Sequence, residues 1–363
     1  MSVQAILARP AGTPPPAWDA EVDDVLICRA VHDETHDVRT FVFSAPEPRL
    51  FHFRPGQFLT FEFQIGGESV HRCYTLASSP TRPNTIAITV KRVPGGPVSN
   101  WLHDTLKVGG AIRALGPMGE FTCADHPAAK YLFLSAGSGV TPLMSMARAH
   151  HDLASDADIV FIHSARSPAD IVFRDEVALM ERVRSGFRAA AICETAGDGW
   201  AGLTGRLGQQ QLDQLAPDFR EREIFVCGPA GYMEAAKAML VAAGFDMTRH
   251  HEESFDFATL NAAEPELAEP AAASTETQYT ISFANSGRTV TCGPDTFVLD
   301  AARAAGMRLP SSCTKGMCGT CKSKMVAGAV NMTHAGGIRQ REIDQGMILL
   351  CCSRPTSDLI IER

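Results

Sequence analysis

The sequence lacks any apolar run long enough to cross a membrane. Its longest apolar stretches, residues 131–134 and 347–350, have the length of a buried strand, whereas a membrane helix needs about 20 consecutive apolar residues. The N-terminus, MSVQAILARPAGTPPPAWDAE, also lacks the basic segment and the apolar segment of a secretory signal peptide. We therefore expect a cytoplasmic protein without membrane contact, which begins with a disordered tail over residues 1–20.

The sequence also has no excess of basic residues. Lys and Arg number 33 against 41 Asp and Glu, and the formal net charge is -8 at pH 7. Nucleic-acid binding requires clustered basic side chains that contact phosphates, so this balance argues against a nucleic-acid partner. No tandem repeat is visible, and the 363 residues are too many for one small core, which predicts two or three domains.

The first of these domains, over residues 21–125, is expected to be rich in β-structure. The segments VRTFVFSA, GQFLTFEFQI and TIAITVKRV alternate apolar and polar residues, and Pro and Gly separate them. This period of two predicts an antiparallel barrel or sandwich.

The next region, residues 126–258, alternates short apolar strands with helices. YLFLSAG, DIVFIHSAR, FRAAAICET and EIFVCG are typical of buried strands, and VTPLMSMARAHHDL, FRDEVALMERV and AGYMEAAKAMLVAAG are typical of helices. Thr141 is the expected N-cap of the first helix, with Pro142 at its first position. This order predicts a parallel, doubly wound α/β domain.

A linker and a small C-terminal domain complete the chain. NAAEPELAEPAAASTETQ is rich in Ala, Glu and Pro and has no periodicity, which indicates a linker at residues 259–277. Residues 278–363 then contain two predicted strands (YTISFANSG, RTVTCG), a helix (TFVLDAARAAG), a cysteine-rich loop, a polar stretch and a final strand pair (GMILLCCSRP, DLIIER).

Several of the eleven cysteines are spaced as ligands of an iron–sulfur cluster. Cys313, Cys318 and Cys321 follow the C-x4-C-x2-C spacing of plant-type [2Fe-2S] proteins, and the pair Cys351 and Cys352 follows later. A zinc ribbon would need two C-x2-C pairs, and adjacent cysteines suit its tetrahedral geometry poorly. The spacing alone leaves open which member of the pair is the fourth ligand.

Residues 278–363 resemble the plant-type ferredoxin family, whose α+β fold is the β-grasp. In that family the last cysteine ligand lies four residues before a proline, as Cys351 does before Pro355 in ILLCCSRPTSD. The resemblance therefore implies a [2Fe-2S] cluster held by Cys313, Cys318, Cys321 and Cys351. The isolated cysteines are expected to be small buried hydrophobes, apart from those in the motifs below.

HRCYTLASSP, residues 71–80, resembles the flavin-binding motif of the ferredoxin–NADP reductase family. In that family the arginine, here Arg72, pairs with flavin phosphate, and the tyrosine, here Tyr74, packs beside the flavin. The hydroxyl that reaches flavin N5 belongs to Thr75, where relatives commonly have serine. The resemblance implies the following flavin-binding residues: Arg72, Cys73, Tyr74, Thr75, Lys91, Gly96, Val98, Ser99 and Phe255.

Two further segments bear on the flavin. In KRVPGGPVSNWL, glycines end a strand and Ser99 is expected to cap a helix that starts at Asn100, whose free N–H groups suit a pyrophosphate. GPMGEF, residues 116–121, resembles the segment that closes the FAD barrel in this family, which favours FAD over FMN. Phe255 is the expected aromatic contact of the flavin, although it could instead anchor the linker.

LSAGSGVTPLMSM resembles the nucleotide-binding turn of the same family. It lacks the third glycine of G-x-G-x-x-G, but it follows a strand and opens a helix, where a pyrophosphate can meet backbone N–H groups. In VCGPAGYM, the family resemblance places Cys227 beside the nicotinamide C4. The implied NAD(P)-binding residues are Gly137, Ser138, Gly139, Thr141, Pro142, Ser164, Arg166, Cys227, Gly228 and Pro229, and the implied catalytic residues are Thr75, Thr141 and Cys227.

The choice between NADH and NADPH depends on HSARSP. Its Ser164 and Arg166 stand where relatives that use NADPH bind the 2′-phosphate, but SPADIVFRDE also resembles members that use NADH. We expect NADH.

The two resemblances cover residues 23–363 and imply a relay from NADH through FAD to the [2Fe-2S] cluster. Flavin links the two-electron chemistry of nicotinamide to the one-electron chemistry of the cluster. The sequence has no Rieske C-x-H pairs, so a separate acceptor protein is expected. The domain order most resembles reductase components of Rieske-type monooxygenases that demethylate glycine betaine and related quaternary amines. The reductase of the hybrid-cluster protein and a non-catalytic iron–sulfur redox sensor are the alternatives.

Overall fold

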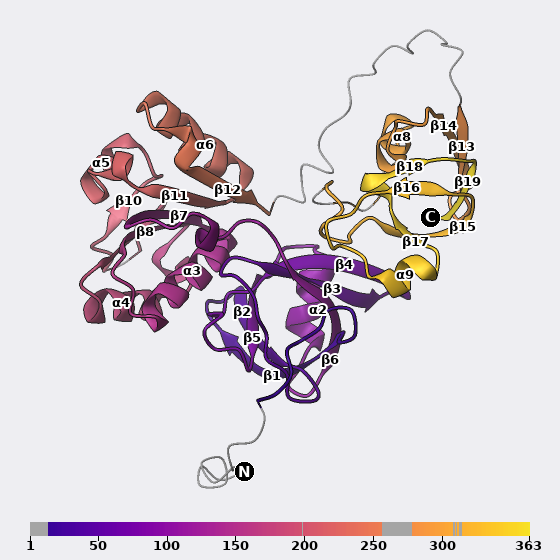
Figure 1. Ribbon diagram of the computed structural model, residues 1–363. Helices are drawn as coiled ribbons and strands as arrows, with labels where there is room; N and C mark the ends of the chain where they lie inside the picture. Colours follow the sequence, from indigo (N-terminus) through magenta and orange to yellow (C-terminus); the bar gives the residue numbers. More distant parts are fainter. Residues whose placement is uncertain (1–13, 198, 256–277, 308, 310, 312–313) are drawn as a thin grey trace.

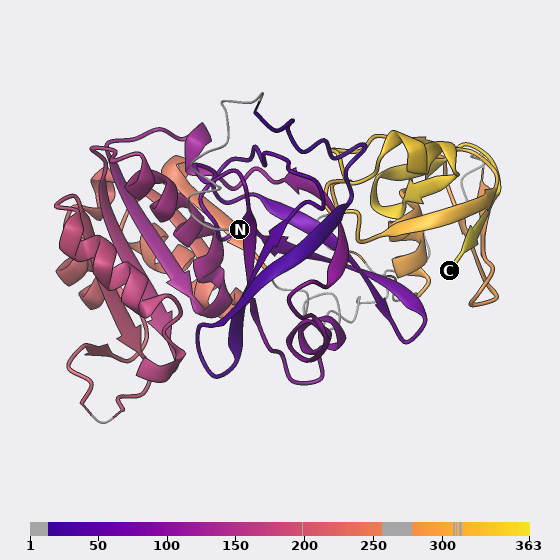
Figure 2. The same ribbon diagram turned by 90° about the horizontal axis from the view of Figure 1, so that it is seen from below.

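The computed structural model describes residues 14–197, 199–255, 278–307, 309, 311 and 314–363 (Figure 1). The expected linker, the expected cluster ligand Cys313 and most of the expected N-terminal tail lie outside these residues. Three groups of strands and helices follow one another along the chain, and the first lies between the other two (Figures 1 and 2). No helix in the described part of the chain has the length and apolar character needed to cross a bilayer.

The N-terminal group is an antiparallel barrel. Its strands are β1 (Val25–Asp33), β2 (Val38–Ser44), β3 (Phe58–Ile65), β4 (Glu68–Thr75), β5 (Ile86–Lys91) and β6 (Ala111–Met118), in the order β4-β3-β6-β1-β2-β5. A bridge between Leu76 and Ile88 joins the two edge strands and closes the sheet. Alternate residues such as Phe41, Phe43 and Phe61 fill the interior, as the period of two requires. Helix α2 (Pro97–Thr105) packs against this barrel.

Part of the segment expected to be a disordered tail is ordered on the barrel. The indole of Trp18 is buried 5.2 Å from the ring of Phe51, and its Nε1 donates a 3.0 Å hydrogen bond to the carbonyl of Gly116. Burial of this large apolar ring holds the residues before β1 against the barrel, although their composition is rich in proline and alanine.

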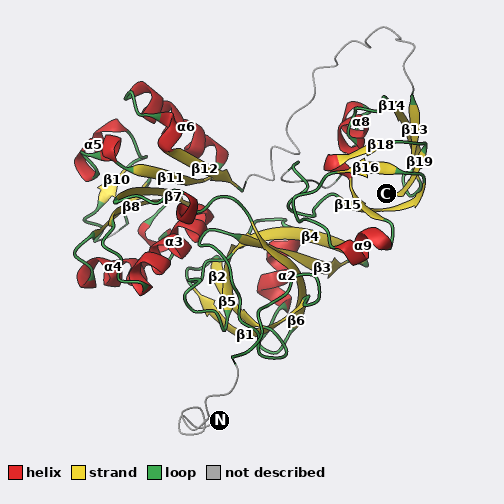
Figure 3. Ribbon diagram, viewed as in Figure 1, coloured by secondary structure: helices red, strands yellow, loops and turns green. Residues whose placement is uncertain are grey.

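The second group along the chain is a parallel sheet with helices on both faces (Figure 3). Its strands are β7 (Lys130–Ala136), β8 (Asp158–Ala165), β9 (Phe187–Cys193), β10 (Leu203–Thr204), β11 (Glu223–Gly228) and β12 (His250–Ser254), in the order β10-β9-β8-β7-β11-β12. Helices α3 (Val140–Asp152) and α4 (Arg174–Val183) share one core with Phe133 and Phe161. Helices α5 (Gln209–Leu215) and α6 (Ala230–Ala242) share the other core with Leu132 and Val160. The doubly wound prediction is confirmed.

Two predicted helix caps are wrong. Helix α3 begins at Val140 with Gly139 as N-cap, and the Thr141 hydroxyl donates to the carbonyl of Ser138 over 3.1 Å. Helix α2 begins at Pro97 with Gly96 as N-cap, so Ser99 lies inside its first turn. In both cases a glycine before the expected cap makes the turn, and the hydroxyl bonds to the preceding loop.

The C-terminal group has the predicted α+β architecture. Strands β13 (Tyr279–Phe283), β14 (Arg288–Cys292), β15 (Lys322–Ala327), β17 (Met347–Leu349) and β19 (Leu359–Glu362) form a sheet in the order β14-β13-β19-β15-β17, and helix α8 (Val298–Ala304) packs on it. Strands β16 (Val330–Met332) and β18 (Ser353–Pro355) form a separate pair. The polar stretch of the sequence contains β15, β16 and helix α9 (Gln340–Asp344), which the periodicity did not indicate.

Candidate functional site

A cavity of about 480 Å³ opens between the barrel and the first turn after β7. The end of β4, the end of β5 and the loop into α2 form most of its wall. The lining includes every flavin-binding residue expected from the sequence: Arg72, Cys73, Tyr74, Thr75, Lys91, Gly96, Val98, Ser99 and Phe255. Ser138 and Thr141 of the expected nicotinamide site line the same cavity, so the two predicted sites adjoin.

One side of the cavity carries a cation that forms no ion pair with a carboxylate in the described part of the chain. Arg72 donates to the carbonyl of His71 over 2.7 Å, and among the described residues no acidic side chain forms an ion pair with it. Beside it, burial raises the pKa of the Tyr74 hydroxyl, so this side chain is neutral at ordinary pH. A planar guanidinium with several N–H donors beside a half-buried aromatic ring suits a flavin and its phosphates.

The loop into α2 forms the other end of the cavity. Ser99 Oγ accepts a 3.1 Å hydrogen bond from the backbone N–H of Val93 and so holds this loop in place. A Cβ at Gly96 would lie 2.8 Å from the same oxygen, which leaves room for hydrogen only. The N–H groups of the first turn of α2 have no acceptors within the helix, and a pyrophosphate fits such an end.

The turn after β7 packs directly on the end of β11. A Cβ at Gly139 would lie 2.3 Å from the carbonyl oxygen of Cys227, so only glycine permits this approach. Cys227 is fully buried, and burial raises the pKa of its thiol well above the ordinary value. The predicted turn and the predicted cysteine therefore meet at the carboxyl ends of adjacent parallel strands, where such sheets bind ligands.

Glu253 was not singled out from the sequence, yet it lies at this point of the sheet. It pairs with Cys227 across the β11–β12 ladder, and its buried Oε2 has no hydrogen-bond partner among the described atoms. Burial, with a smaller effect of Cys73, raises its pKa to about 8. The sequence could not separate it from its neighbour Glu252, which is exposed and pairs with Lys237 over 2.8 Å.

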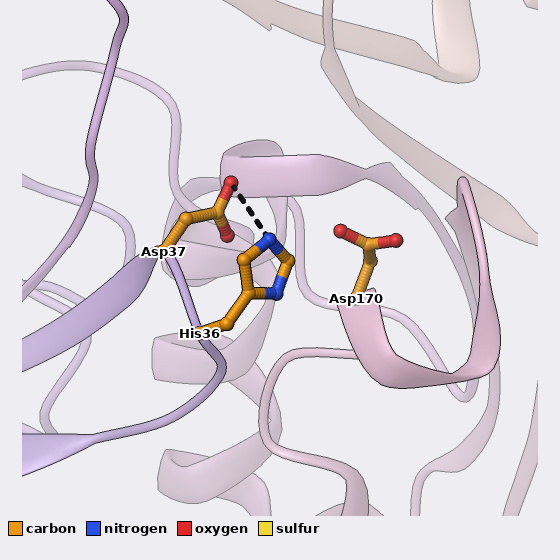
Figure 4. A group of neighbouring side chains, drawn as sticks. All are labelled: His36, Asp37 and Asp170. Atoms are coloured by element: carbon orange, nitrogen blue, oxygen red, sulfur yellow. Dashed lines mark ion pairs between the residues drawn. The ribbon is translucent and has the colours of Figure 1, made fainter.

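Arg166, at the end of β8, belongs to a cluster of charges between barrel and sheet domain. Its guanidinium is 62% exposed and lies 3.3 Å from Asp37 and 3.1 Å from Asp170. Figure 4 shows both carboxylates on either side of His36. Their oxygens and the His36 ring lie close enough to hold a metal ion. However, Arg166 and Lys91, which is 3.2 Å from Asp37, already neutralise them, so this arrangement is an ion-pair cluster.

The cysteine-rich loop of the C-terminal domain brings several thiols together. Cys318, Cys321 and Cys351 are buried, and the backbone N–H of Leu350 donates to the carbonyl of Cys321. The backbone N–H of Gly316 donates to Cys351 Sγ over 3.3 Å. N–H donors directed at sulfur stabilise thiolates, so this donor set fits a [2Fe-2S] cluster.

Two glycines in this loop have no room for a side chain. Gly316 and Gly319 both have φ of +69°. A Cβ on Gly316 would lie 2.7 Å from Cys352 Sγ, and one on Gly319 would lie 2.7 Å from the carbonyl oxygen of Gly337. The loop therefore needs glycine at both positions for its conformation and for its packing.

The cysteine-rich loop touches the wall of the cavity. Thr60 Oγ1 donates a 2.6 Å hydrogen bond to the carbonyl of Cys318, and Cys73 Sγ lies 3.8 Å from the same oxygen. Since Cys73 also lines the cavity, one strand separates the expected flavin site from the expected cluster site.

Three family models match the chain, one in each group of elements. Residues 27–123 match the oxidoreductase FAD-binding domain, residues 133–238 match the oxidoreductase NAD-binding domain, and residues 282–356 match the 2Fe-2S iron-sulfur cluster binding domain. The three cofactors expected from the sequence, FAD, a nicotinamide dinucleotide and a [2Fe-2S] cluster, are thereby confirmed.

Similar proteins extend over almost the whole chain. The glycine betaine monooxygenase reductase subunit of Chromohalobacter salexigens is 47% identical, with 92% of this chain and 94% of the relative covered. The stachydrine N-demethylase reductase subunit Stc4 of Rhizobium meliloti is 40% identical, with 93% and 96% covered. The structure of phthalate dioxygenase reductase has the same fold, with a TM-score of 0.56 at 24% identity and 93% of this chain and 97% of that chain covered. The chain belongs to the family of ferredoxin–NADP reductase-like flavoproteins whose FAD-binding and NAD-binding domains precede a plant-type [2Fe-2S] ferredoxin domain.

Proposed function

We propose that this chain is the reductase component of a monooxygenase that acts on glycine betaine or a related quaternary amine. It takes electrons from NADH and passes them through FAD and its [2Fe-2S] cluster to a separate terminal oxygenase. The observation that carries this assignment is the 47% identity, over 92% of the chain, to a glycine betaine monooxygenase reductase subunit. The shared wall between the cavity and the cysteine-rich loop supports a relay within one chain.

Each domain of the chain would bind one redox cofactor. Residues 21–125 would hold FAD, residues 126–258 would hold NADH, and residues 278–363 would hold the cluster through Cys313, Cys318, Cys321 and Cys351. When bound, FAD accepts two electrons from NADH and releases them singly. Reduced thiols in this number suit the cytoplasm, where we place the protein.

The residues around the cavity would orient the two nucleotides. Arg72 and the first turn of α2 would bind the phosphates of FAD, and the Thr75 hydroxyl would lie toward its reactive ring. Thr141 and Cys227 would hold the nicotinamide against that ring, and the close packing of Gly139 on Cys227 fixes their positions. The neutral thiol of Cys227 adds no charge beside the transferred hydride.

Cys351 is favoured over Cys352 as the fourth ligand. Its sulfur accepts the Gly316 N–H bond at 3.3 Å, as a cluster thiolate would, whereas Cys352 Sγ donates to the carbonyl of Leu349 over 3.7 Å.

The charges around Arg166 favour NADH over NADPH. A 2′-phosphate would need this guanidinium, which Asp37 and Asp170 already engage. Burial alone would raise the pKa of Asp37, but Lys91, Thr35 and His36 together outweigh it and hold that pKa below its ordinary value, so the carboxylate is charged. A second phosphate charge beside two carboxylates is unfavourable.

Reconstitution tests the proposed function. The holoprotein, NADH, oxygen and glycine betaine are combined with the oxygenase component of a glycine betaine monooxygenase, and dimethylglycine and formaldehyde are measured. We expect product only when both proteins and NADH are present. Rapid NADH-driven reduction of cytochrome c without product would contradict this acceptor while leaving the relay intact. Failure to reduce cytochrome c would favour a redox sensor.

A further inference from the structure

A buried arginine of the ferredoxin domain donates hydrogen bonds to the barrel side of the boundary. Arg339, the residue before α9, is 6% exposed. Its guanidinium donates to the backbone carbonyls of Ala20 and, over 2.8 Å, of Ala114. Ala114 lies on β6 of the barrel and Ala20 in the segment that precedes β1, and no carboxylate among the described residues forms an ion pair with Arg339. The charge is therefore satisfied across the domain boundary.

The surrounding contacts position this guanidinium. The Arg339 backbone N–H donates to Glu342 over 2.8 Å, which fixes the start of α9. The next two residues reach the same part of the barrel, since the Gln340 N–H donates to Glu21 over 3.2 Å and Arg341 pairs with Asp24 over 2.9 Å. A rigid planar fork with two carbonyl acceptors sets an orientation, whereas an exposed pair such as Arg341 with Asp24 contributes little.

A second contact between the same domains lies at the cysteine-rich loop. There, Thr60 bonds to the Cys318 carbonyl at 2.6 Å in a buried position. Two separate contacts on one folded domain restrain its rotation on the barrel.

We propose that Arg339 is a positioning residue for electron transfer, which holds the cysteine-rich loop against Thr60 and Cys73 at the wall of the FAD cavity. This inference rests on the proposed function. With FAD in the cavity and a cluster on the cysteine-rich loop, one electron would pass from the reduced flavin to the oxidised cluster, and no bond would form or break. Because tunnelling rates fall exponentially with distance, a domain that leaves the barrel receives electrons more slowly.

The test compares holoproteins carrying Arg339→Met and Arg354→Met. Arg354 is the matched control, because it lies in the same domain and donates to a carbonyl of that domain, Asp295, over 3.1 Å. Small-angle X-ray scattering reports the radius of gyration. Stopped-flow mixing with NADH, with freeze-quench electron paramagnetic resonance, gives the rates of flavin and cluster reduction.

We expect Arg339→Met to increase the radius of gyration and to slow cluster reduction at least about tenfold, in proportion to the fall in the docked fraction. Flavin reduction by NADH and the occupancy of both cofactors should be unchanged, and Arg354→Met should match the wild type. Arg339→Lys, which keeps the charge and part of the donor set, should restore part of the rate, and it replaces Arg339→Met if that variant does not fold.

Thr60→Val tests the second contact and should slow cluster reduction without increasing the radius of gyration. The inference is overturned if Arg339→Met keeps the wild-type radius and rate, or if Arg354→Met has the same effect. If Arg339→Met does not fold and Arg339→Lys is measured in its place, wild-type behaviour of Arg339→Lys also overturns the inference. If NADH does not reduce the flavin of the wild type, the proposed function fails instead.

Discussion

Glu253 lies directly opposite Cys227 in the parallel pairing of β12 with β11, where the predicted nicotinamide turn also packs. Its buried Oε2 has no hydrogen-bond partner among the described atoms, and burial raises its pKa to about 8. A carboxyl group that is neutral at pH 7 therefore lies next to the neutral thiol of Cys227. This pairing avoids a buried negative charge where the proposed function places hydride transfer.

Glu253 should make the stability of the flavin-free protein depend on pH. The unfolded chain loses the Glu253 proton near pH 4.5 and the folded chain only near pH 8, so the folded state binds more protons in between. Its free energy of unfolding therefore falls as pH rises from about 4.5 to about 8, by up to a few kcal/mol. Glu253→Gln should remove this part of the pH dependence.

Thermal unfolding at pH 6, 7 and 8.5 checks this expectation. The difference between variant and wild type should grow in favour of the variant toward high pH. Glu252→Gln, at an exposed neighbour, should leave the wild-type profile unchanged. A constant difference between Glu253→Gln and wild type across the range would contradict a carboxyl group that is neutral at pH 7.

Arg72→Ala should weaken FAD binding. The side chain has no ion-pair partner among the described residues, so we expect the loss of one or two charge-assisted hydrogen bonds to phosphate, roughly 1.5–3 kcal/mol each. The dissociation constant should rise at least about tenfold. Arg29→Ala, at an exposed barrel residue that bonds to Ser44 over 2.7 Å, is the control. If Arg72→Ala purifies with full flavin and wild-type affinity, Arg72 does not bind the phosphates.

Cys318→Ser should remove the cluster and leave the flavin half of the protein active. NADH-driven reduction of ferricyanide should continue, because the core of the ferredoxin domain shares no residue with the cores of the FAD-binding and NAD-binding domains. Iron content and absorbance report the cluster. Loss of ferricyanide reduction while flavin stays bound would contradict the modular relay.

Serine substitutions of the adjacent residues Cys351 and Cys352 can be compared directly for retention of the cluster. Cys351→Ser should lose the cluster, since Cys351 is the proposed fourth ligand and its sulfur accepts the N–H of Gly316. Cys352→Ser should retain it. The opposite result would assign the fourth ligand to Cys352.

Docking of the ferredoxin domain should weaken in acid. His71 lies at the barrel–ferredoxin boundary with Glu62, Lys322, Glu342 and Arg363, and burial, followed by Lys322, lowers its pKa from 6.5 to about 4. If separation of the domains restores the ordinary pKa, the undocked state binds the proton first. Docking then loses free energy as pH falls from about 6.5 to about 4, and it is unaffected by His71 above pH 7.

Scattering measurements between pH 7.5 and pH 5 check this prediction. The radius of gyration of the wild type should rise on acidification, and that of His71→Gln should rise less, because glutamine does not take up a proton. Equal pH dependence of the two proteins would show that His71 does not control docking.

Asp37→Asn should shift coenzyme preference toward NADPH. Removal of this carboxylate releases Arg166 from one of its two acidic partners and lowers the repulsion of a 2′-phosphate. Because solvent screens the exposed Arg166 side chain, the effect should be modest. We expect the ratio of kcat/KM for NADPH to that for NADH to rise about threefold. Asp33→Asn, at an exposed aspartate that pairs with Arg39 over 2.6 Å, should leave the ratio unchanged. A fall of the ratio in Asp37→Asn would contradict the proposed role of Arg166.

The sequence predicted those parts of the fold and site that depend on local pattern. Alternating residues predicted the barrel strands, and the flavin motif around Arg72 and Tyr74 lies at the cavity because both side chains are on one short strand. The helix caps were wrong because glycine turns at Gly96 and Gly139 precede the polar residues that were expected to cap.

Features that depend on docking gave no signal in the sequence. Strand β15 was missed because Lys322 and Ser323, both polar, are buried at its start. Glu253 and Arg339 resemble surface charges, and their burial depends on neighbouring strands and on the barrel, which no local pattern reports.

Anaerobic stopped-flow reduction of the holoprotein by NADH tests the relay most directly. Flavin absorbance should bleach first, and the signal of the reduced [2Fe-2S] cluster should follow. The cluster signal should appear in the wild type and in Cys352→Ser but not in Cys351→Ser. A cluster that stays oxidised beside fully reduced flavin, or a preparation without iron after reconstitution, would contradict the account.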